Sequence, residues 1–524
     1  MKLRTIVKIA ITSSVVLLCS GFALYSFFRL SAAEGQKDFN LYELVPSTTS
    51  AVFVTDDVLE FVAEVDELTC SKNQQYLYVS KLFSYLKQSL YALSEDTPHG
   101  LSRQMNQMLI SFHEPDNERN QVLYCRLGNG DKELVNRFVR KYISSLYPPK
   151  TFIYKGEEII IYPMADGDFL ACYLTSDFMA LSFQKKLIEN VIDAYKSGKS
   201  LADDSTFTGI RAPKKSAAAA TIYTRMQGMM GWTEFDMKMK DDFIYFSGIT
   251  HDADTCFAFI NQLRQQQSVK GFPGEVLPST AFYFSRQGIT DWVSLLSYGN
   301  AQGQSVPART SEVQNRDKEF SRYLMENAGQ DLVACLFQRE DTLQDAAAVL
   351  SLSVADVTEA ERMLRALVNA APADEGRRNP RITFCYTVNK AYPIYRLPQT
   401  TLFEQLTSFA EPTLDVYAAF YGGRLLLAPD ADALAHYIRQ LDKGEVLNGA
   451  MAYQTGMDHL SDSYHFMLMA DFDHIFQQSE NHVRFVPDFF LRNADFFRHF
   501  TLFVQFACAD GMVYPNIVLK YKSE

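Results

Sequence analysis

The chain has 524 residues, a length that predicts three to four domains of ordinary size. Apolar residues make up 47% and charged residues 21% of the chain, which excludes wholesale disorder and collagen-like structure. The formal net charge of −12 argues against a general nucleic-acid binder, which would carry a basic stripe.

The N-terminal segment contains an uncharged stretch, Ile9 to Phe28, behind three basic residues. As a helix it would be about 30 Å long, the thickness of the hydrocarbon core of a bilayer. We therefore predict a membrane anchor at 1–30, with a cytoplasmic N-terminus and the rest of the chain extracytoplasmic, or periplasmic in a cell with two membranes. A signal peptide cleaved near Ser31-Ala32-Ala33 and a lipoprotein acylated at Cys19 are the alternatives.

Short segments recur in the same order along the rest of the chain. The sequence VPST at 45–48 recurs as LPST at 277–280, and GKSLA at 198–202 recurs as GEVLN at 444–448. Because the order is kept, we predict two copies of one unit. The predicted domains are the anchor at 1–30, a linker at 31–40, a first lobe at 41–272 and a second lobe at 273–524.

Strand and helix patterns alternate within the first copy. In chain order we expect a strand at 51–54, followed by a helix that is capped by Thr55, begins with Asp56 and Asp57 and runs to about Ala92. Strands at 107–113 and 121–127 and a helix from Asp131 come next, and then several strands within 151–183 with a turn at Lys155-Gly156. The copy ends with a helix at 184–197 that Gly198 terminates, a strand at 217–223 and a hairpin turn at Asp241-Asp242. Strands that meet through tight turns favour an antiparallel or mixed sheet. The predicted fold class is therefore α+β: two tandem copies of one antiparallel or mixed-sheet lobe with helices, preceded by a single transmembrane helix.

A family resemblance rests on these motifs. The Pro-Ser-Thr sequence before a short strand, followed later by a helix and GKSLADDSTF at 198–207, resembles an uncharacterised bacterial envelope family, known only as a domain of unknown function. Members of that family have an N-terminal anchor and a repeated α+β ectodomain. The resemblance implies the same fold and location for 41–524, and it implies no catalytic or binding residues.

No complete catalytic or metal-binding motif occurs in the sequence. The pattern S-x-x-K begins at Ser84 and at Ser182 without its companion elements, and Gly128-Asn129-Gly130 lacks the rest of a phosphate-binding loop. His465 and His474 lack the spacing of a zinc site. We therefore predict no cofactor and no metal, and we expect the cysteines after Cys19 to be small buried residues, with one long-range disulfide left open.

The two copies differ most in one segment, which is Met226 to Trp232 in the first copy and the phenylalanine-rich 472–500 in the second. Exposed aromatic and methionine side chains suit partner binding. The predicted partner-binding residues are Phe476, Phe485, Phe489, Phe490, Phe496, Phe497 and Trp232. An extra helix that packs on the lobe is the alternative, favoured by the near-helical spacing of the last phenylalanines.

These observations favour a non-enzymatic envelope protein that binds a protein partner or acts as a scaffold. It would be attached to the membrane through its N-terminal helix and would not bind nucleic acid. Two other hypotheses stay open. One is a hydrolase of envelope polymers or lipids with its site in the cleft between the lobes. The other is a protein that binds a lipid or another small molecule.

Overall fold

The computed structural model of the protein describes most of the chain after the predicted anchor. The described residues are 39–73, 105–113, 119–128, 131–138, 147–164, 167–211, 218–225, 231–250, 263–290, 292, 311–339, 346–370, 381–398, 415–478 and 486–522. Within these segments, no helix has both the length and the apolar character needed to cross a membrane. The predicted anchor at 1–30 lies outside them, so the location inferred from it stays a prediction.

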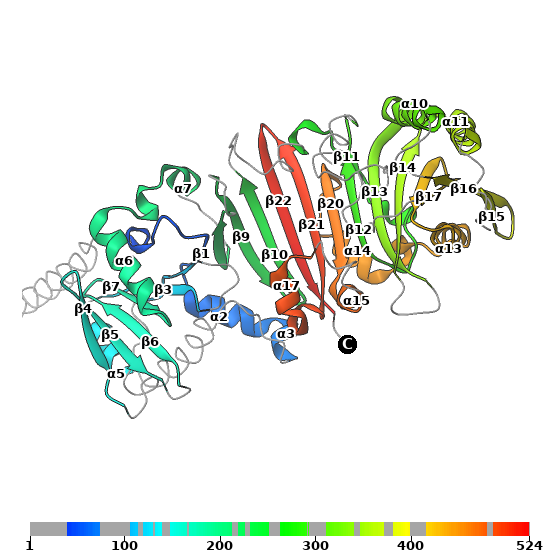
Figure 1. Cartoon of the computed structure of the whole chain (residues 1–524). Coiled ribbons are helices and arrows are strands. Elements are labelled where there is room, and N and C mark those ends of the chain that lie inside the picture. Colours follow the sequence, from blue (N-terminus) through cyan, green and yellow to red (C-terminus); the bar gives the residue numbers. More distant parts are fainter. Residues whose placement is uncertain are drawn as a thin grey trace, which may run out of the picture.

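An antiparallel sheet of 20 strands runs through the described residues from end to end (Figure 1). From one edge to the middle, the paired strands are β4 (Lys150–Tyr154), β5 (Glu157–Pro163), β6 (Phe169–Leu174), β7 (Phe178–Ser182), β3 (Gln121–Arg126), β2 (Met108–Phe112), β1 (Ala51–Thr55), β8 (Ala220–Thr224), β9 (Thr233–Lys240) and β10 (Phe243–Thr250). From the middle to the other edge they are β22 (Met512–Tyr521), β21 (Phe500–Ala509), β20 (Phe466–Asp471), β12 (Ala281–Gly288), β13 (Ala328–Gln338), β14 (Ala346–Val354), β18 (Arg424–Ala428), β17 (Asp415–Tyr421), β16 (Ala391–Pro398) and β15 (Ile382–Tyr386). A separate small sheet pairs β11 (Val269–Lys270) with β19 (Ser463–Tyr464).

The strand order of the second half is the reverse of the first about the joint between β10 and β22. In each half the first strand pairs with the second strand and with the eighth, as β1 does with β2 and β8 and β12 does with β13 and β20. Ser247 of β10 and Asn516 of β22 are register partners. Each lies equally far from its hairpin turn, which Asp241 and Asp510 mark with φ values of +51° and +52°. A pseudo-twofold axis therefore passes between Ser247 and Asn516.

This architecture corrects the predicted fold class. The prediction of two separate α+β lobes is wrong, because both halves form one antiparallel sheet, and strand makes up 42% and helix 33% of the described residues. The transmembrane helix of that prediction lies outside the described residues. The physical reason lies at the strand edges. Each half ends in a strand with unpaired backbone groups, and pairing β10 with β22 satisfies those groups.

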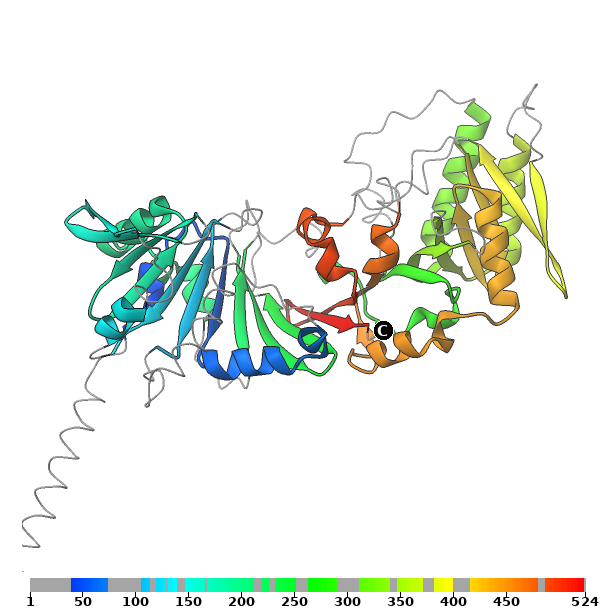
Figure 2. The ribbon, with the colours of Figure 1, turned by 90° about the horizontal axis from the view of Figure 1, so that it is seen from below.

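Helices cover both faces of the sheet. One face carries α6 (Lys185–Ser197) and α7 (Ser205–Ile210) in the first half, and α13 (Ala431–Asp442) and α14 (Met451–Met457) in the second. The opposite face carries α2 (Val58–Glu67), α3 (Thr69–Lys72), α5 (Asp131–Phe138), α10 (Ser311–Asn327), α11 (Val357–Ala370), α15 (Phe472–Phe476), α17 (Asp488–Arg492) and α18 (Ala494–Phe497). Short 3-10 turns are η1 (Leu41–Leu44), η3 (Leu201–Asp203), η4 (Pro273–Glu275) and η5 (Leu447–Gly449). Figure 2 shows the resulting elongated molecule, with helices at both ends.

Three hydrophobic cores result from this layering. Alternate residues of a strand point to opposite faces, so the neighbours Val52 and Phe53 of β1 enter different cores. Val52 packs in a core that belongs to the first half alone, and Phe284 packs in the matching core of the second half. Phe53 joins a core on the other face that also contains Leu350 and Phe500 of the second half. This third core is shared, so both halves depend on it.

Most local predictions for the first half are confirmed. The strands β2 and β3, the helix α6 and the turns at Lys155-Gly156 and Asp241-Asp242 lie where the sequence places them, and Gly198 ends α6 with a φ of +64°. The cap of α2 was assigned to the wrong residue. The Asp57 carboxylate accepts the backbone N–H of Glu60 at 2.9 Å, whereas the hydroxyl of Thr55 donates to the carbonyl of Ala219. The α2 helix ends at Glu67, and the predicted continuation falls largely outside the described residues.

The described cysteines are free thiols. Five of them are buried, namely Cys70, Cys125, Cys172, Cys335 and Cys385, and Cys508 is half-buried. Burial raises the pKa of the Cys172 thiol to about 12, so this group stays protonated at neutral pH. These side chains therefore act as small apolar residues, as the sequence predicts.

Candidate functional site

The aromatic segment of the second half forms α15, α17 and α18, which lie beside β21 and β22 near the joint (Figure 1). The ring of Phe490 stacks on Phe472 with 4.9 Å between centroids and meets Phe497 at 4.8 Å. The ring centroids of Phe496 and Phe500 are 4.9 Å apart, and those of Phe476 and Phe472 are 5.4 Å apart. These rings pack on the shared core, which fits the alternative of extra helices on the sheet.

The other predicted partner-binding residues do not join this cluster in the described structure. Phe485 and the side chain of Phe489 lie outside the described residues. Trp232 is only 1% exposed and packs in the core of the first half, with its ring 5.0 Å from Phe207. A buried tryptophan in a different core offers no surface to a partner.

An ion-pair cluster lies at the start of α15. Asp471 accepts a hydrogen bond from Nζ of Lys522 at 2.5 Å, and its carboxylate lies 3.3 Å from Nδ1 of His474. Burial favours a higher pKa for Asp471, but the neighbouring His474 ring and the charge of Lys522 outweigh burial and hold that pKa below its usual value. The same contact with Asp471 raises the pKa of His474 above its usual value.

We expect His474→Gln to reduce stability more at about pH 5.5 than at about pH 8.5. Because the folded pKa of His474 is raised, protonated His474 contributes stability that is fully present below its unfolded pKa of about 6.5 and is lost as the pH rises through the folded pKa. Urea unfolding of wild type and variant at both pH values measures the difference. His436→Gln in α13 is the control, and an equal loss at both pH values would contradict the expectation.

The described residues of the motifs that resemble catalytic ones have structural roles, and Ser84 lies outside the described residues. The buried hydroxyl of Ser182 donates to the carbonyl of Gln121 at 2.8 Å, and the backbone N–H of Gly128 donates to the carboxylate of Asp131 at 2.7 Å. The Nδ1 atom of His465 accepts the backbone N–H of Cys508 at 3.1 Å. Across the described residues, no group of three His, Cys, Asp or Glu side chains is placed to hold a metal ion.

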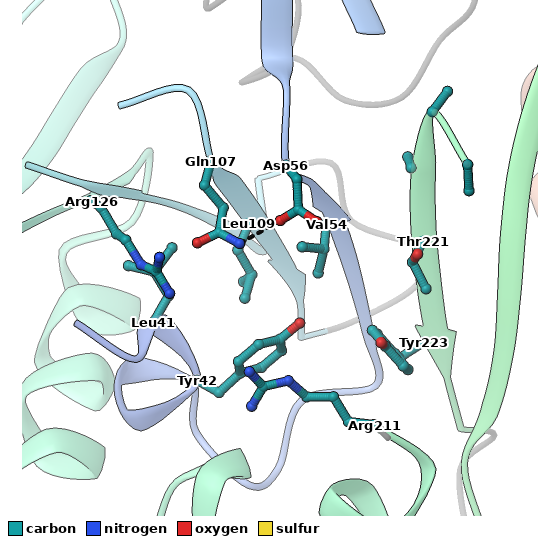
Figure 3. Close-up of a pocket in the computed structure, with 13 residues that line it drawn as sticks. Leu41, Tyr42, Val54, Asp56, Gln107, Leu109, Arg126, Arg211, Thr221 and Tyr223 are labelled. Atoms are coloured by element: carbon teal, nitrogen blue, oxygen red, sulfur yellow. Dashed lines mark hydrogen bonds between the residues drawn. The ribbon is translucent and has the colours of Figure 1, made fainter. Parts of the chain in front are cut away.

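A polar pocket lies in the first half, where η1 covers the ends of β1, β2, β3 and β8 (Figure 3). Its volume is about 390 Å³. It is lined by Leu41, Tyr42, Val54, Asp56, Gln107, Leu109, Arg126, Arg211, Ala218, Ala219, Ala220, Thr221 and Tyr223. These residues come from six separate segments of the chain, so no single stretch of sequence marks the pocket.

Two arginines reach this pocket from different elements. Arg126 is the last residue of β3, and its Nε donates to the carbonyl of Phe39 at 2.6 Å. Arg211 follows directly on α7, whose first turn is capped by the Asp204 carboxylate. The guanidinium carbon of Arg211 lies 3.9 Å from the centroid of the Tyr42 ring, a cation–π contact that holds the group in place. The pocket therefore carries two fixed positive charges.

Two tyrosines add hydrogen-bond donors to these charges. Tyr42 lies in η1 and Tyr223 in β8. Burial raises the pKa of Tyr223 to about 12, with Arg211 acting in the opposite direction, and burial raises the pKa of Tyr42 as well. Both phenols are therefore protonated at neutral pH and able to donate. Guanidinium and phenol groups together form the donor set that recognises carboxylate and phosphate.

One carboxylate lies on the other side of the pocket. Asp56 follows β1, and Figure 3 shows it beside Gln107 and away from Arg211. The side-chain amide of Gln107 donates to the Asp56 carboxylate. Among the lining residues that the structure describes, Asp56 is the one acid, and none is a histidine, cysteine or serine. This composition suits binding better than acid–base or nucleophilic chemistry.

The described residues at the matching position of the second half are arranged differently. The strand register gives the corresponding residues of the two halves. Val54 of β1 corresponds to Arg286 of β12, Gln107, which directly precedes β2, to Asp331 of β13, and Arg126 of β3 to Ser353 of β14. Arg286 Nε donates to Asp331 at 2.9 Å, and the hydroxyl of Ser353 donates to Asp331 at 3.2 Å. Three positions whose side chains line the pocket in the first half thus carry, in the second half, side chains that bond to one another.

The turn that covers the pocket differs in the same way. Gly274 takes the place of Tyr42, and a Cβ atom at Gly274 would lie 2.7 Å from the Tyr453 ring. No side chain fits there without a shift of its neighbours. Comparison of the two copies at this position would have been a signal for the site, because the aromatic side chain is present in one copy only.

Comparison of the chain with protein-family models, with curated proteins and with solved structures yields no match. The resemblance to the envelope family therefore stays a prediction.

Proposed function

We propose that this chain is a non-enzymatic binding protein whose first half holds a small anionic molecule between Arg126, Arg211, Tyr42 and Tyr223. The observation that carries the proposal is the contrast between the halves. Two guanidinium groups and two protonated phenols line one pocket, whereas in the other half the residues at the places of Val54, Gln107 and Arg126 bond to one another. A volume of about 390 Å³ is in the lower part of the range for small-molecule sites.

The alternative of a hydrolase with a site between two lobes has less support. The β10–β22 ladder occupies the middle of the molecule, where the sequence predicts a cleft. The pocket itself offers one carboxylate, and acid–base hydrolysis of glycosidic bonds needs a pair. The envelope protein partner predicted from the aromatic segment stays a prediction, because the described rings of that segment pack largely on the shared core.

We expect Arg211→Gln to weaken anion binding by about 10- to 100-fold, since a hydrogen bond to a charged group contributes roughly 1.5–3 kcal/mol. Isothermal titration calorimetry of the full chain with inorganic phosphate and a panel of small carboxylates measures the loss. The matched control is Arg316→Gln, which removes an arginine of α10 that pairs with Glu319 at 2.9 Å on the surface. Failure of every anion to bind the wild type, or unchanged binding by the variant, would reject the proposal.

A further inference from the structure

The pocket of the first half contains charges of both signs, and Arg211 and Asp56 lie on opposite sides of it. Arg211 lies over the Tyr42 ring, while Asp56 and Gln107 lie across the pocket from it in Figure 3. A ligand with negative charge alone would meet the field of Asp56 as well as that of the arginines. A ligand with one anionic and one cationic end would match both sides.

The side chain of Gln107 adds a second argument. Its amide nitrogen donates to Asp56, while its Oε1 atom is buried and has no hydrogen-bond partner among the described residues. A buried acceptor without a donor is costly, so a donor beside it is favoured. An ammonium group has three donors and no acceptor, which allows it to bond both Asp56 and Gln107.

The carboxylate of Asp56 also has no counterpart at the matching position of the second half. Where the first half has Asp56 and Asp57 after β1, the second half has Gly288 at the end of β12. A Cβ atom on Gly288 would lie 2.0 Å from the backbone oxygen of Gln267, so the backbone itself fills this position. Asp56 and Arg126 of the first half therefore have Gly288 and Ser353 at their places in the second half.

We infer that the ligand is a small zwitterion, with its carboxylate at Arg211 and its ammonium group at Asp56 and Gln107. Amino acids and short peptides with free termini are the class of molecule that has these two groups. This inference rests on the proposed function, because it assigns the ligand class of the same pocket.

The test uses two probes that differ only in the amino group, alanyl-phenylalanine and propionyl-phenylalanine. We expect the full-length wild type to bind alanyl-phenylalanine at least about 10-fold more tightly, in line with a charge-assisted hydrogen bond. Asp56→Asn should remove that difference by weakening the binding of alanyl-phenylalanine, with the affinity for propionyl-phenylalanine kept or increased. Asp432→Asn, the same change at an exposed site of α13, should leave both affinities unchanged.

The outcomes separate the two proposals. Equal affinity of the wild type for both probes, or an equal effect of Asp56→Asn on both, would overturn the zwitterion inference and leave anion binding standing. If neither probe binds and no anion of the wider panel binds, the proposed function itself fails. Since Asp56 is exposed, thermal unfolding of Asp56→Asn should match that of the wild type, and this measurement shows that the variant is folded.

Discussion

Replacing Asp331 with alanine is expected to cost roughly 3–5 kcal/mol of folding free energy, because removal of one partner leaves buried charge without compensation. The Asp331 carboxylate lies 2.9 Å from Arg286 and 3.2 Å from Arg424, and its side chain is only 10% exposed. Two guanidinium groups therefore share one acid inside the second half. Urea unfolding of wild type and variant measures the loss as a shift of the midpoint.

The control for Asp331→Ala is Glu319→Ala in α10. Glu319 pairs with Arg316 at 2.9 Å, but both side chains are about half exposed. An exposed ion pair contributes about 0–1 kcal/mol, so this variant should unfold close to the wild type. Equal losses for the two variants would mean that Asp331 is not the buried centre of a network.

Replacing Phe500 with alanine is expected to cost roughly 3–5 kcal/mol, the range for a large aromatic side chain removed from a packed core. Phe500 is fully buried in the shared core, with ring centroids 4.9 Å from Phe496 and 5.4 Å from Tyr521. Phe384→Ala in β15 is the matched control, because that ring is 53% exposed and its loss should change stability by no more than about 0.5 kcal/mol.

The same variant tests whether the two halves unfold together. The chain has two tryptophans, Trp232 in the first half and Trp292 in the second. Variants that keep one tryptophan, Trp292→Phe and Trp232→Phe, report on each half separately by fluorescence. Because the shared core and the β10–β22 ladder connect the halves, Phe500→Ala should shift both transitions by the same amount. A shift of the Trp292 transition alone would show that the halves are independent.

Local structure was predictable from the sequence because it depends on neighbouring residues. The apolar spacing of 184–197 and the glycine after it specify α6, since the exposed and buried faces of a helix repeat every 3.6 residues. The turn at Asp241-Asp242 is specified by residues that tolerate positive φ. The collinear repeats predicted two copies of one unit, and the structure pairs β1 and β12 with the corresponding strands of their halves.

The candidate site was not predictable in this way. Tyr42, Asp56, Arg126 and Arg211 are far apart in the sequence, and none belongs to a motif. The aromatic residues were the more visible signal, but the fate of a phenylalanine depends on whether another element covers it. Phe497 is buried by its neighbours and Phe384 is exposed, although both are rings in apolar segments.

The sequence by itself determined the alternation of strands and helices, the existence of two related halves and the small-residue role of the described cysteines, because hydrophobic period and turn residues act over short distances. Only the tertiary structure decided that the halves share one sheet and one core, and that Gln107 and Arg126 line a pocket in the first half while Asp331 and Ser353, at the same places in the second, bond to each other. Edge pairing and side-chain packing bring together residues hundreds of positions apart in the sequence. Ser247 of β10 and Asn516 of β22, for example, are register partners in the sheet. No pattern within either segment specifies its partner, since every strand edge presents the same backbone donors and acceptors.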